Sequence, residues 1–236
     1  MSDKSGLIIF DLDDTLIDTS DVYWQAKESF IDVLYTKNIS RQLIGDLFEK
    51  ADTKNMSLLG FDPGRYLQSM NETYDFLINN YNVENSTSTR EKIKESGNRI
   101  NNNMPNPIDG AKELLEWAST KFTLALLTRG IEELQLKKIK HTQFEKYFTT
   151  LSIVANKDHT TFKKVVNQLN FETENTWLIG DSIKSDINPG IQAGIKCIFY
   201  RYKHHTYTWT QEYGDKPLGK FHTITNLLAA KEILSK

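Results

Sequence analysis

The chain has a single cysteine among its 236 residues, Cys197, and no apolar run that approaches ~20 residues, the length needed to span a bilayer. One cysteine excludes an intrachain disulfide and is typical of proteins from a reducing compartment. The apolar run nearest the N-terminus, residues 7–10, is too short for the core of a signal peptide. From these absences we expect a cytoplasmic protein with no membrane partner.

The sequence also lacks an excess of charge of either sign. It has 29 Lys and Arg against 31 Asp and Glu, which gives a formal net charge of −2. Nucleic-acid-binding proteins need a surplus of basic residues to neutralise phosphates, so this balance argues against a nucleic-acid partner. An anionic small molecule would have to be attracted by a local site. The sequence does not indicate an oligomeric state.

Five short apolar runs predict the strands of a parallel sheet. None of them alternates polar with apolar residues, which is typical of strands covered on both faces. The runs are residues 7–10, 124–127, 151–154, 177–179 and 197–200. Residues 111–118 and 162–169 have helical periodicity, and residues 189–194 resemble a short helix that ends at a glycine. This alternation predicts an α/β fold with a doubly wound, Rossmann-like core.

A long segment after the first predicted strand interrupts this alternation. Apolar residues recur in it at helical spacing over residues 22–34, 43–51 and 66–78. Ser88 and Glu91 have the spacing of a helix-capping box. We therefore predict a helical insert over residues 18–106 and an α/β core formed by residues 1–17 and 107–236.

Carboxylates follow two of the predicted strands. Ligands of an open α/β sheet bind beyond the carboxyl ends of its strands, so residues at these positions are candidate site residues. Asp11, Asp13 and Asp14 follow the first run, and Asp181 and Asp186 follow the fourth. Carboxylates this close repel one another, and a hard cation with oxygen ligands relieves the repulsion. The alternative at both places is an acidic segment that only begins a helix.

Polar side chains follow the second and third runs as well. Thr128 and Arg129 precede Gly130, where a hydroxyl and backbone amides can bind an anion. Lys157 follows the third run. A Thr-Arg-Gly turn and a solvated lysine are both common in loops, so neither signal identifies a site by itself.

The order of these signals resembles the haloacid dehalogenase superfamily. Its first motif, an apolar strand followed by Asp-x-Asp-x-Thr, is matched by residues 10–16, and its second, a strand ending in Thr or Ser, by Thr128. Its third, a single lysine, is matched by Lys157, and its fourth, Gly-Asp followed by a further Asp, by residues 180–186. The resemblance covers nearly the whole chain.

Two features of this resemblance leave choices open. Many members have a proline soon after the third-motif lysine, which this chain lacks, so Lys163 and Lys164 are alternatives to Lys157. The insert matches the helical cap that many members carry between the first two motifs. Within it, residues 54–66, including Arg65, are candidates for contacting the leaving group of a substrate.

The resemblance implies a magnesium-dependent phosphatase that hydrolyses a small phosphorylated metabolite through an aspartyl-phosphate. Asp11 is then the nucleophile, and Asp13 protonates the leaving group and later activates water. Mg²⁺ is held by Asp11, Asp181 and the backbone carbonyl of Asp13, while Asp186 acts through water.

The resemblance also assigns the phosphate-binding groups. Thr128 and Lys157 bind the phosphate oxygens, Lys157 steadies Asp11, and Arg129 contributes through its backbone amide. Asp13 argues against dehalogenases and phosphonate-cleaving relatives, which lack this second acidic residue. A phosphomutase with the same motifs and a non-catalytic binding module on the same scaffold are the alternatives.

Overall fold

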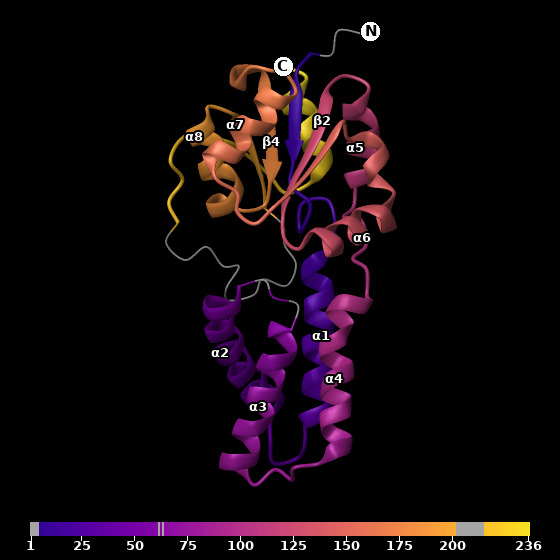
Figure 1. The fold of residues 1–236 in the computed structure, drawn as a ribbon, viewed down its shortest axis with the longest axis vertical. Helices are drawn as coiled ribbons and strands as arrows, with labels where there is room; N and C mark the ends of the chain where they lie inside the picture. The colour runs from indigo at the N-terminus through magenta and orange to yellow at the C-terminus, as the bar shows by residue number, and fades with distance from the viewer. Residues whose placement is uncertain (1–4, 61, 63, 202–214) are drawn as a thin grey trace. The chain divides into compact units, whose positions relative to one another are not determined.

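The structure is a computed structural model that describes residues 5–60, 62, 64–201 and 215–236. The chain divides into two compact units (Figure 1). The α/β unit comprises the described residues of Met1–Thr19, Pro105–His204 and Glu212–Lys236, and the helical unit comprises those of Ser20–Met104.

A parallel sheet of six strands forms the middle of the α/β unit. The strands are β1 (Leu7–Phe10), β2 (Thr123–Arg129), β3 (Thr150–Val154), β4 (Thr176–Gly180), β5 (Lys196–Tyr200) and β6 (His222–Ile224). They lie in the order β3-β2-β1-β4-β5-β6, and each neighbouring pair is parallel. This is a strand order of doubly wound α/β proteins, so the predicted fold class is confirmed.

The first strand of the chain lies in the centre of the sheet. Leu7 pairs with Thr123 of β2 on one side and with Thr176 of β4 on the other. All residues of β1 are buried, which explains why the sequence shows a continuous apolar run there. The five predicted strands are all present. The sixth, β6, was not predicted, because it is a three-residue edge strand with two exposed residues.

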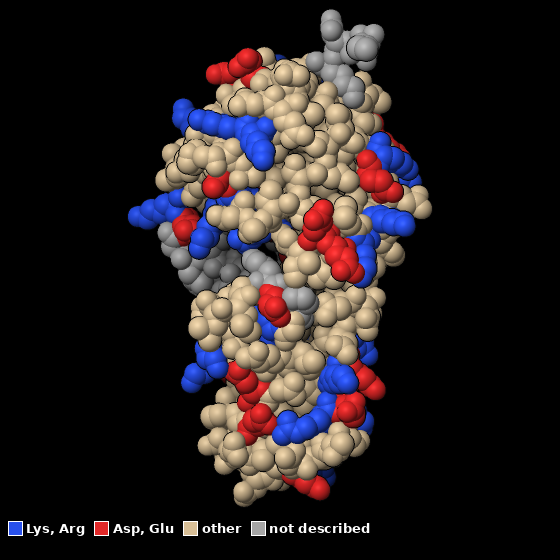
Figure 2. Space-filling view, in the orientation of Figure 1, with Lys and Arg blue, Asp and Glu red and all other residues tan. Residues whose placement is uncertain are grey.

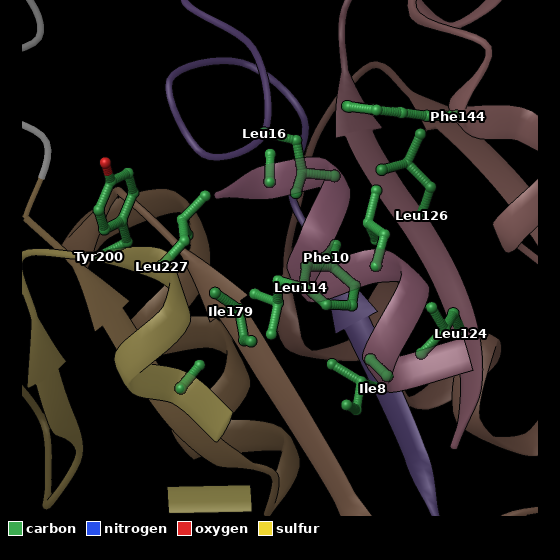
Figure 3. Close-up of a cluster of buried hydrophobic side chains, with 14 of the residues drawn as sticks. Ile8, Phe10, Leu16, Leu114, Leu124, Leu126, Phe144, Ile179, Tyr200 and Leu227 are labelled. Carbon is green, nitrogen blue, oxygen red and sulfur yellow. The ribbon is translucent and has the colours of Figure 1, made fainter. Parts of the chain in front are cut away.

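Helices cover both faces of the sheet. The helices of this unit are α5 (Ala111–Ser119), α6 (Glu132–Thr142), α7 (His159–Gln168), α8 (Asn188–Ala193) and α9 (Ala230–Leu234), with short turns η1 (Phe144–Tyr147), η2 (Thr173–Asn175), η3 (Ile183–Ile187) and η4 (Leu227–Ala229). Ile8 and Phe10 pack in one apolar cluster with Leu114 of α5 (Figure 3). Leu7 and Ile9 point to the opposite face, where their cluster includes residues of α7.

The helical unit has a core of its own. It is built from α1 (Thr19–Leu34), α2 (Arg41–Leu59), α3 (Arg65–Tyr81) and α4 (Thr87–Asn102). Its buried cluster includes Phe30, Phe48, Tyr66, Tyr74 and Ile93, and it contains no residue of the sheet. The apolar stripes of the sequence are thus the packed faces of these helices.

The start of α4 differs from the capping box that was predicted at Ser88. Ser86 is the N-cap, and its hydroxyl accepts a hydrogen bond from the Thr89 amide at 3.4 Å. The Ser86 amide donates to the Tyr74 hydroxyl at 3.0 Å, and that hydroxyl donates to the Glu84 carbonyl at 2.6 Å. The prediction was wrong because a contact with α3 fixes where the chain enters the helix.

Arg65 has a structural partner inside the helical unit. Its side chain is 2 % exposed and forms an ion pair with the buried Asp52, to which the Ser69 hydroxyl also donates at 3.0 Å. This pair joins α2 to α3, so the guanidinium has a structural role within the helical unit. Residues 61 and 63 of the same segment lie outside the described residues.

The chain leaves and re-enters the α/β unit at one place. Ile17 forms an antiparallel bridge with Pro107, and the Asp18 amide donates to the Asn106 carbonyl at 2.8 Å. The Ile108 amide donates to the Leu16 carbonyl at 2.9 Å. The ends of the helical insert are therefore adjacent.

Charge is distributed without a dominant sign on the face shown in Figure 2, where basic and acidic side chains are interspersed over each unit. This pattern agrees with the near-neutral formal charge of the sequence. Among the residues that the structure describes, no helix has the length and apolar character that a transmembrane helix requires.

Candidate active site

The loop after β1 carries the first group of site residues. Asp11 directly follows the strand, is 5 % exposed, and donates its backbone amide to the Ile179 carbonyl of β4 at 3.0 Å. The chain then turns sharply, with Asp14 in the left-handed region at φ 56°, a conformation that aspartate tolerates better than most residues. The turn places the Thr15 hydroxyl 3.3 Å from Asp11 Oδ2 and 3.4 Å from Asp181 Oδ1.

Three carboxylates from two distant segments converge beside this loop. One oxygen each from Asp11, Asp181 and Asp186 lies within 4.8 Å of the others. Gly180 makes the close approach possible, because a Cβ at this position would lie 2.6 Å from Asp186 Cγ. The Ser182 amide donates to Asp186 Oδ2 at 3.2 Å, within the π-helical turn η3 that follows β4. Turns of this kind often occur at functional sites.

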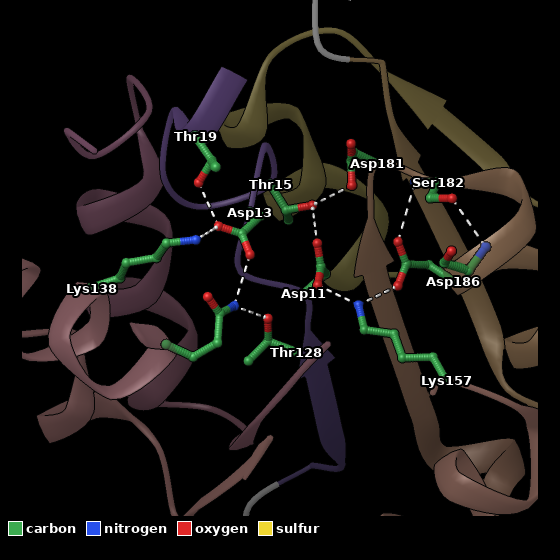
Figure 4. Close-up of polar contacts among 12 residues, drawn as sticks. Asp11, Asp13, Thr15, Thr19, Thr128, Lys138, Lys157, Asp181, Ser182 and Asp186 are labelled. Carbon is green, nitrogen blue, oxygen red and sulfur yellow. Dashed lines mark hydrogen bonds and ion pairs between the residues drawn. The ribbon is translucent and has the colours of Figure 1, made fainter. Parts of the chain in front are cut away.

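A buried lysine lies between two of these carboxylates (Figure 4). Lys157 Nζ forms ion pairs with Asp11 Oδ1 and, at 2.8 Å, with Asp186 Oδ1. The lysine precedes Asp158, which caps α7 by accepting the Thr161 amide at 2.8 Å. The alternatives that the sequence left open, Lys163 and Lys164, are exposed on α7. Of these three lysines, Lys157 is the one that the structure brings to the carboxylates.

Burial makes this cluster electrostatically unfavourable without a cation. Burial raises the pKa of Asp11 to about 7, although Lys157 opposes the shift. Burial, followed by the charges of Asp11 and Asp14, raises the pKa of Asp181 well above its usual range. Burial alone would lower the pKa of Lys157, but Asp11 and Asp186 outweigh it and the net pKa is raised. The cluster of three carboxylates and Lys157 therefore favours the binding of a further cation.

The donor atoms fit a hard divalent cation. Lys157 engages Asp11 Oδ1 and Asp186 Oδ1, and the Ser182 amide engages the second oxygen of Asp186. The contacts of Asp11 Oδ2 and Asp181 Oδ1 that are shown in Figure 4 are with the Thr15 hydroxyl. All three side chains offer the carboxylate oxygens that Mg²⁺ prefers. Asp186, with both oxygens engaged, is better placed to act through water.

Asp13 has a different environment from the other carboxylates. Its Oδ1 accepts hydrogen bonds from Thr19 Oγ1 and, at 2.7 Å, from Lys138 Nζ. Its Oδ2 accepts from Gln135 Nε2 at 2.7 Å. Burial would raise the pKa of Asp13, but Lys138 and these hydrogen bonds outweigh it and the net pKa is lowered. The side chain of Asp13 therefore points toward α6 and away from the three-carboxylate cluster (Figure 4).

The end of β2 completes the site. Thr128 is 1 % exposed, and its hydroxyl oxygen accepts a hydrogen bond from Gln135 Nε2 at 2.6 Å. Arg129 is the last residue of β2, is half-buried and pairs with Val154 of β3. Six of the candidates from the sequence thus meet at the carboxyl edge of the sheet, namely Asp11, Asp13, Thr128, Lys157, Asp181 and Asp186.

Sequence reasoning missed three residues that contact Asp13. Thr19 lies in the first turn of α1, and Gln135 and Lys138 lie on α6, a helix that the apolar pattern did not indicate. The available signals for α6 were Glu132 and Glu133 in its first turn and Lys140 with His141 in its last. A helix that begins at Glu132 places Gln135 and Lys138, three residues apart, on one face.

Comparison with known proteins gives a consistent family. The sequence model described as haloacid dehalogenase-like hydrolase matches residues 8–200. The HAD-hydrolase YfnB of Bacillus subtilis is 25 % identical over 204 residues, with 80 % of each chain covered. The glyceraldehyde 3-phosphate phosphatase of Pyrococcus furiosus is 24 % identical over 238 residues, covering 98 % of this chain and 93 % of that protein.

Solved structures agree with the fold. A haloacid dehalogenase-like family hydrolase from Xanthomonas campestris superposes with a TM-score of 0.71 at 22 % identity, covering 98 % of this chain and 96 % of that one. The crystal structure of YfnB bound to magnesium superposes with a TM-score of 0.68 at 18 % identity, covering 99 % of this chain and all of that one.

Proposed function

Since the chain belongs to the haloacid dehalogenase-like hydrolases, we propose that it is a magnesium-dependent phosphatase that hydrolyses a small phosphorylated metabolite. The observation that carries the proposal is the contrast between two carboxylates only two positions apart. Asp11 lies in the three-carboxylate cluster, while Asp13 lies outside it and contacts α6. Two carboxyl groups in different environments can take different catalytic roles.

In the first step, a carboxylate oxygen of Asp11 attacks the phosphorus of the ester. The bond between phosphorus and the ester oxygen breaks, and the leaving oxygen takes a proton from Asp13. The products of this step are an alcohol and an aspartyl-phosphate on Asp11. A dianionic phosphate bound nearby favours the protonated form of Asp13 that this step requires, because like charges raise the pKa of a carboxyl group.

In the second step, a water molecule attacks the phosphorus of the aspartyl-phosphate. Asp13, now a carboxylate, accepts a proton from this water, and the bond between phosphorus and the Asp11 oxygen breaks. Inorganic phosphate leaves, and both aspartates return to their starting states. The hydrogen bonds that Asp13 accepts in the structure support the carboxylate form that this step needs.

The remaining residues bind charge. Asp11 and Asp181 would hold Mg²⁺ directly, the backbone carbonyl of Asp13 would add a ligand, and Asp186 would act through water. When bound, the ion neutralises charge on the transferring phosphate. Lys157 keeps Asp11 in place beside the phosphate. Removal of one donor from such a site typically lowers the rate by about 10².

Two further groups that could bind the charged phosphate lie at the end of β2. The Thr128 hydroxyl and the amide of Arg129 are proposed to bind phosphate oxygens. Two observations support this substrate class: Asp11, Thr128 and Lys157 are buried, and the name of the similar Pyrococcus furiosus enzyme specifies glyceraldehyde 3-phosphate. We therefore propose a small phosphorylated metabolite as substrate.

The first prediction tests the nucleophile and the metal together. Phosphate release from a panel of phosphorylated metabolites is measured with Mg²⁺ and with EDTA, for the wild type and for Asp11→Asn. We expect EDTA to stop turnover, Mg²⁺ to restore it, and Asp11→Asn to lower kcat by at least about 10³-fold, because the amide is a poor nucleophile.

A matched control is Glu174→Gln, the same chemical change at an exposed residue of η2, which precedes β4 at the amino end of the strands. This variant should keep wild-type activity. Near-normal turnover by Asp11→Asn, or full activity of the wild type in EDTA, would contradict the proposed mechanism.

A further inference from the structure

The polar face of α6 holds Asp13 from one side. Gln135 is 3 % exposed, and its amide nitrogen lies 2.7 Å from Asp13 Oδ2. One turn later, Lys138 Nζ lies 2.7 Å from Asp13 Oδ1, with 18 % of its side chain exposed. Two donors from one helix thus take the two different oxygens of a single carboxylate, which fixes the plane of the carboxyl group as well as its position.

Gln135 also connects Asp13 to the end of β2. Its Nε2 lies 2.6 Å from Thr128 Oγ1, so its two N–H groups serve two acceptors. The nitrogen must face Asp13, because a carboxylate can only accept hydrogen bonds. A Thr128 oxygen that accepts from Gln135 directs its own hydrogen elsewhere. The hydroxyl is therefore left ready to donate to an anion.

The turn before α6 makes room for this glutamine. A Cβ at Gly130 would lie 3.1 Å from both Cγ and Cδ of Gln135, which is closer than side chains ordinarily pack. The glycine after Thr128 thus leaves the space that the Gln135 side chain occupies on its way to Asp13. The backbone at Gly130 and the burial of Gln135 therefore help to fix where this side chain lies.

We propose that Gln135 and Lys138 are positioning residues that hold the Asp13 carboxyl and the Thr128 hydroxyl in the geometry needed for protonation of the leaving group. The inference rests on the proposed function, since it assigns a task to Asp13. Neither residue reacts with the substrate. Each acts by fixing the direction in which Asp13 delivers its proton.

A positioning role has a signature that a purely structural role lacks. Attack by Asp11 on phosphorus does not need Asp13, whereas departure of a basic leaving group does. A variant that only misplaces Asp13 should therefore lose more activity on an ester with a poor leaving group than on one with a good leaving group. A variant that damages the site in general should lose the same factor on both.

The experiment compares two aryl esters in Mg²⁺, phenyl phosphate and 4-nitrophenyl phosphate, for the wild type, Gln135→Met and Lys138→Met. Methionine matches the glutamine side chain in length, is one atom shorter than the lysine side chain, and removes the donors of both. We expect kcat/KM to fall about 10-fold or more on phenyl phosphate and less than about 3-fold on 4-nitrophenyl phosphate. Lys138→Arg, which keeps a donor, should recover part of the loss.

A second readout follows the intermediate. Asp13 also activates the water of the second step, so the variants should release about one equivalent of nitrophenolate in a burst before a slower steady rate. Matched controls are Gln42→Met, an exposed glutamine of α2 that hydrogen-bonds to Asp46, and Lys137→Met, an exposed neighbour that pairs with Glu133. Both controls should behave as the wild type on both esters.

Equal loss on the two esters, or no loss in either variant, would overturn the inference and leave the proposed function standing. A wild type that turns over neither ester nor any metabolite of the panel would instead remove the proposed function, and the inference with it. Thermal unfolding of each variant in Mg²⁺ confirms that the folded protein is the species compared.

Discussion

Lys157 is a buried cation whose removal would leave two carboxylates facing each other. Its ammonium pairs with Asp11 and with Asp186, and all three side chains are at most 7 % exposed. Deleting one partner of a buried ionic group is costly, because the remaining charges lose their compensation. For Lys157→Met without metal, we expect the free energy of unfolding to fall by about 3 kcal/mol.

Urea unfolding in EDTA and in Mg²⁺ measures this effect. Mg²⁺ should recover part of the loss, because an ion that binds only the folded state stabilises it. Lys163→Met is the matched control, since Lys163 is exposed on α7 and should change stability by less than about 0.5 kcal/mol. A Lys157→Met protein as stable as this control would show that the pair contributes nothing to stability.

The raised pKa of Asp11 predicts how the stability of the metal-free protein depends on pH. Burial raises this pKa to about 7, whereas an unfolded aspartate titrates near ~4. Between these values the folded state binds more protons than the unfolded state. The stabilisation that protonated Asp11 provides is fully present below pH ~4, and it is lost as the pH rises to about 7.

We therefore expect the metal-free protein to lose stability between pH 5 and pH 8, and Asp11→Asn to lose less over the same range. Thermal unfolding in EDTA at several pH values measures both slopes. Parallel slopes for the two proteins would contradict the prediction. With Mg²⁺ the trend should reverse, because the ion binds the ionised carboxylates.

The convergence of the site residues was predictable for a geometric reason. Asp11 and Asp181 directly follow buried strands and Thr128 is the second-last residue of β2, and parallel strands present their carboxyl ends at one edge. Gln135 and Lys138 were not predictable this way. They lie within a helix, and their contact with Asp13 depends on how that helix packs.

Two glycines in the helical unit show how packing decides the effect of the same substitution. Gly45 lies within α2, and a Cβ there would meet only Ile31 Cδ1 at 3.8 Å. Gly97 lies within α4, and a Cβ there would lie 2.9 Å from Leu67 Cβ and 3.2 Å from its Cα. The close approach of α4 to α3 thus depends on Gly97.

We expect Gly45→Ala to stabilise the protein by about 0.5–1 kcal/mol, because alanine loses less backbone entropy in a helix. Gly97→Ala should destabilise it by about 1–3 kcal/mol through overpacking. Urea unfolding of the two variants measures both values. If the two variants shifted stability in the same direction, the packing difference between these positions would be ruled out as the cause.

Elements were predictable where burial leaves a simple pattern. The five continuous apolar runs became β1 to β5: β1, β2, β4 and β5 are largely buried, and β3 is a half-buried edge strand. β6 and α6 were missed for opposite reasons. β6 is too short and exposed to show a pattern, while α6 buries only Gln135 and Ile139 and leaves the apolar Leu136 exposed. Ser86 shows that a contact with Tyr74 can decide where a helix begins.

The whole chain is two units with separate cores, and every contact of the candidate site described above lies in the α/β unit. The insert leaves and returns where the Asp18 amide donates to the Asn106 carbonyl at 2.8 Å. A chain in which residues 21–103 are replaced by a short Gly-Ser linker should therefore fold and bind Mg²⁺. Loop closure of this kind adds little entropy cost.

Circular dichroism of the shortened chain measures whether it folds, and thermal unfolding with and without Mg²⁺ measures whether it binds the ion. We expect one cooperative transition that moves to higher temperature as Mg²⁺ is added. As a control, Asp181→Asn in the same shortened chain should weaken the response to Mg²⁺. A broad transition that Mg²⁺ does not shift would mean that the α/β unit depends on the insert.

The central position of β1 has a consequence for synthesis on the ribosome. Leu7 to Phe10 are made first, but their partners in the sheet begin at Thr123 and Thr176. Until those segments emerge, this apolar segment has no strand to pair with and stays exposed. Chaperones can therefore bind the nascent chain over most of its translation. Hydrolytic competence would then appear all at once and late, after Asp186 has left the exit tunnel.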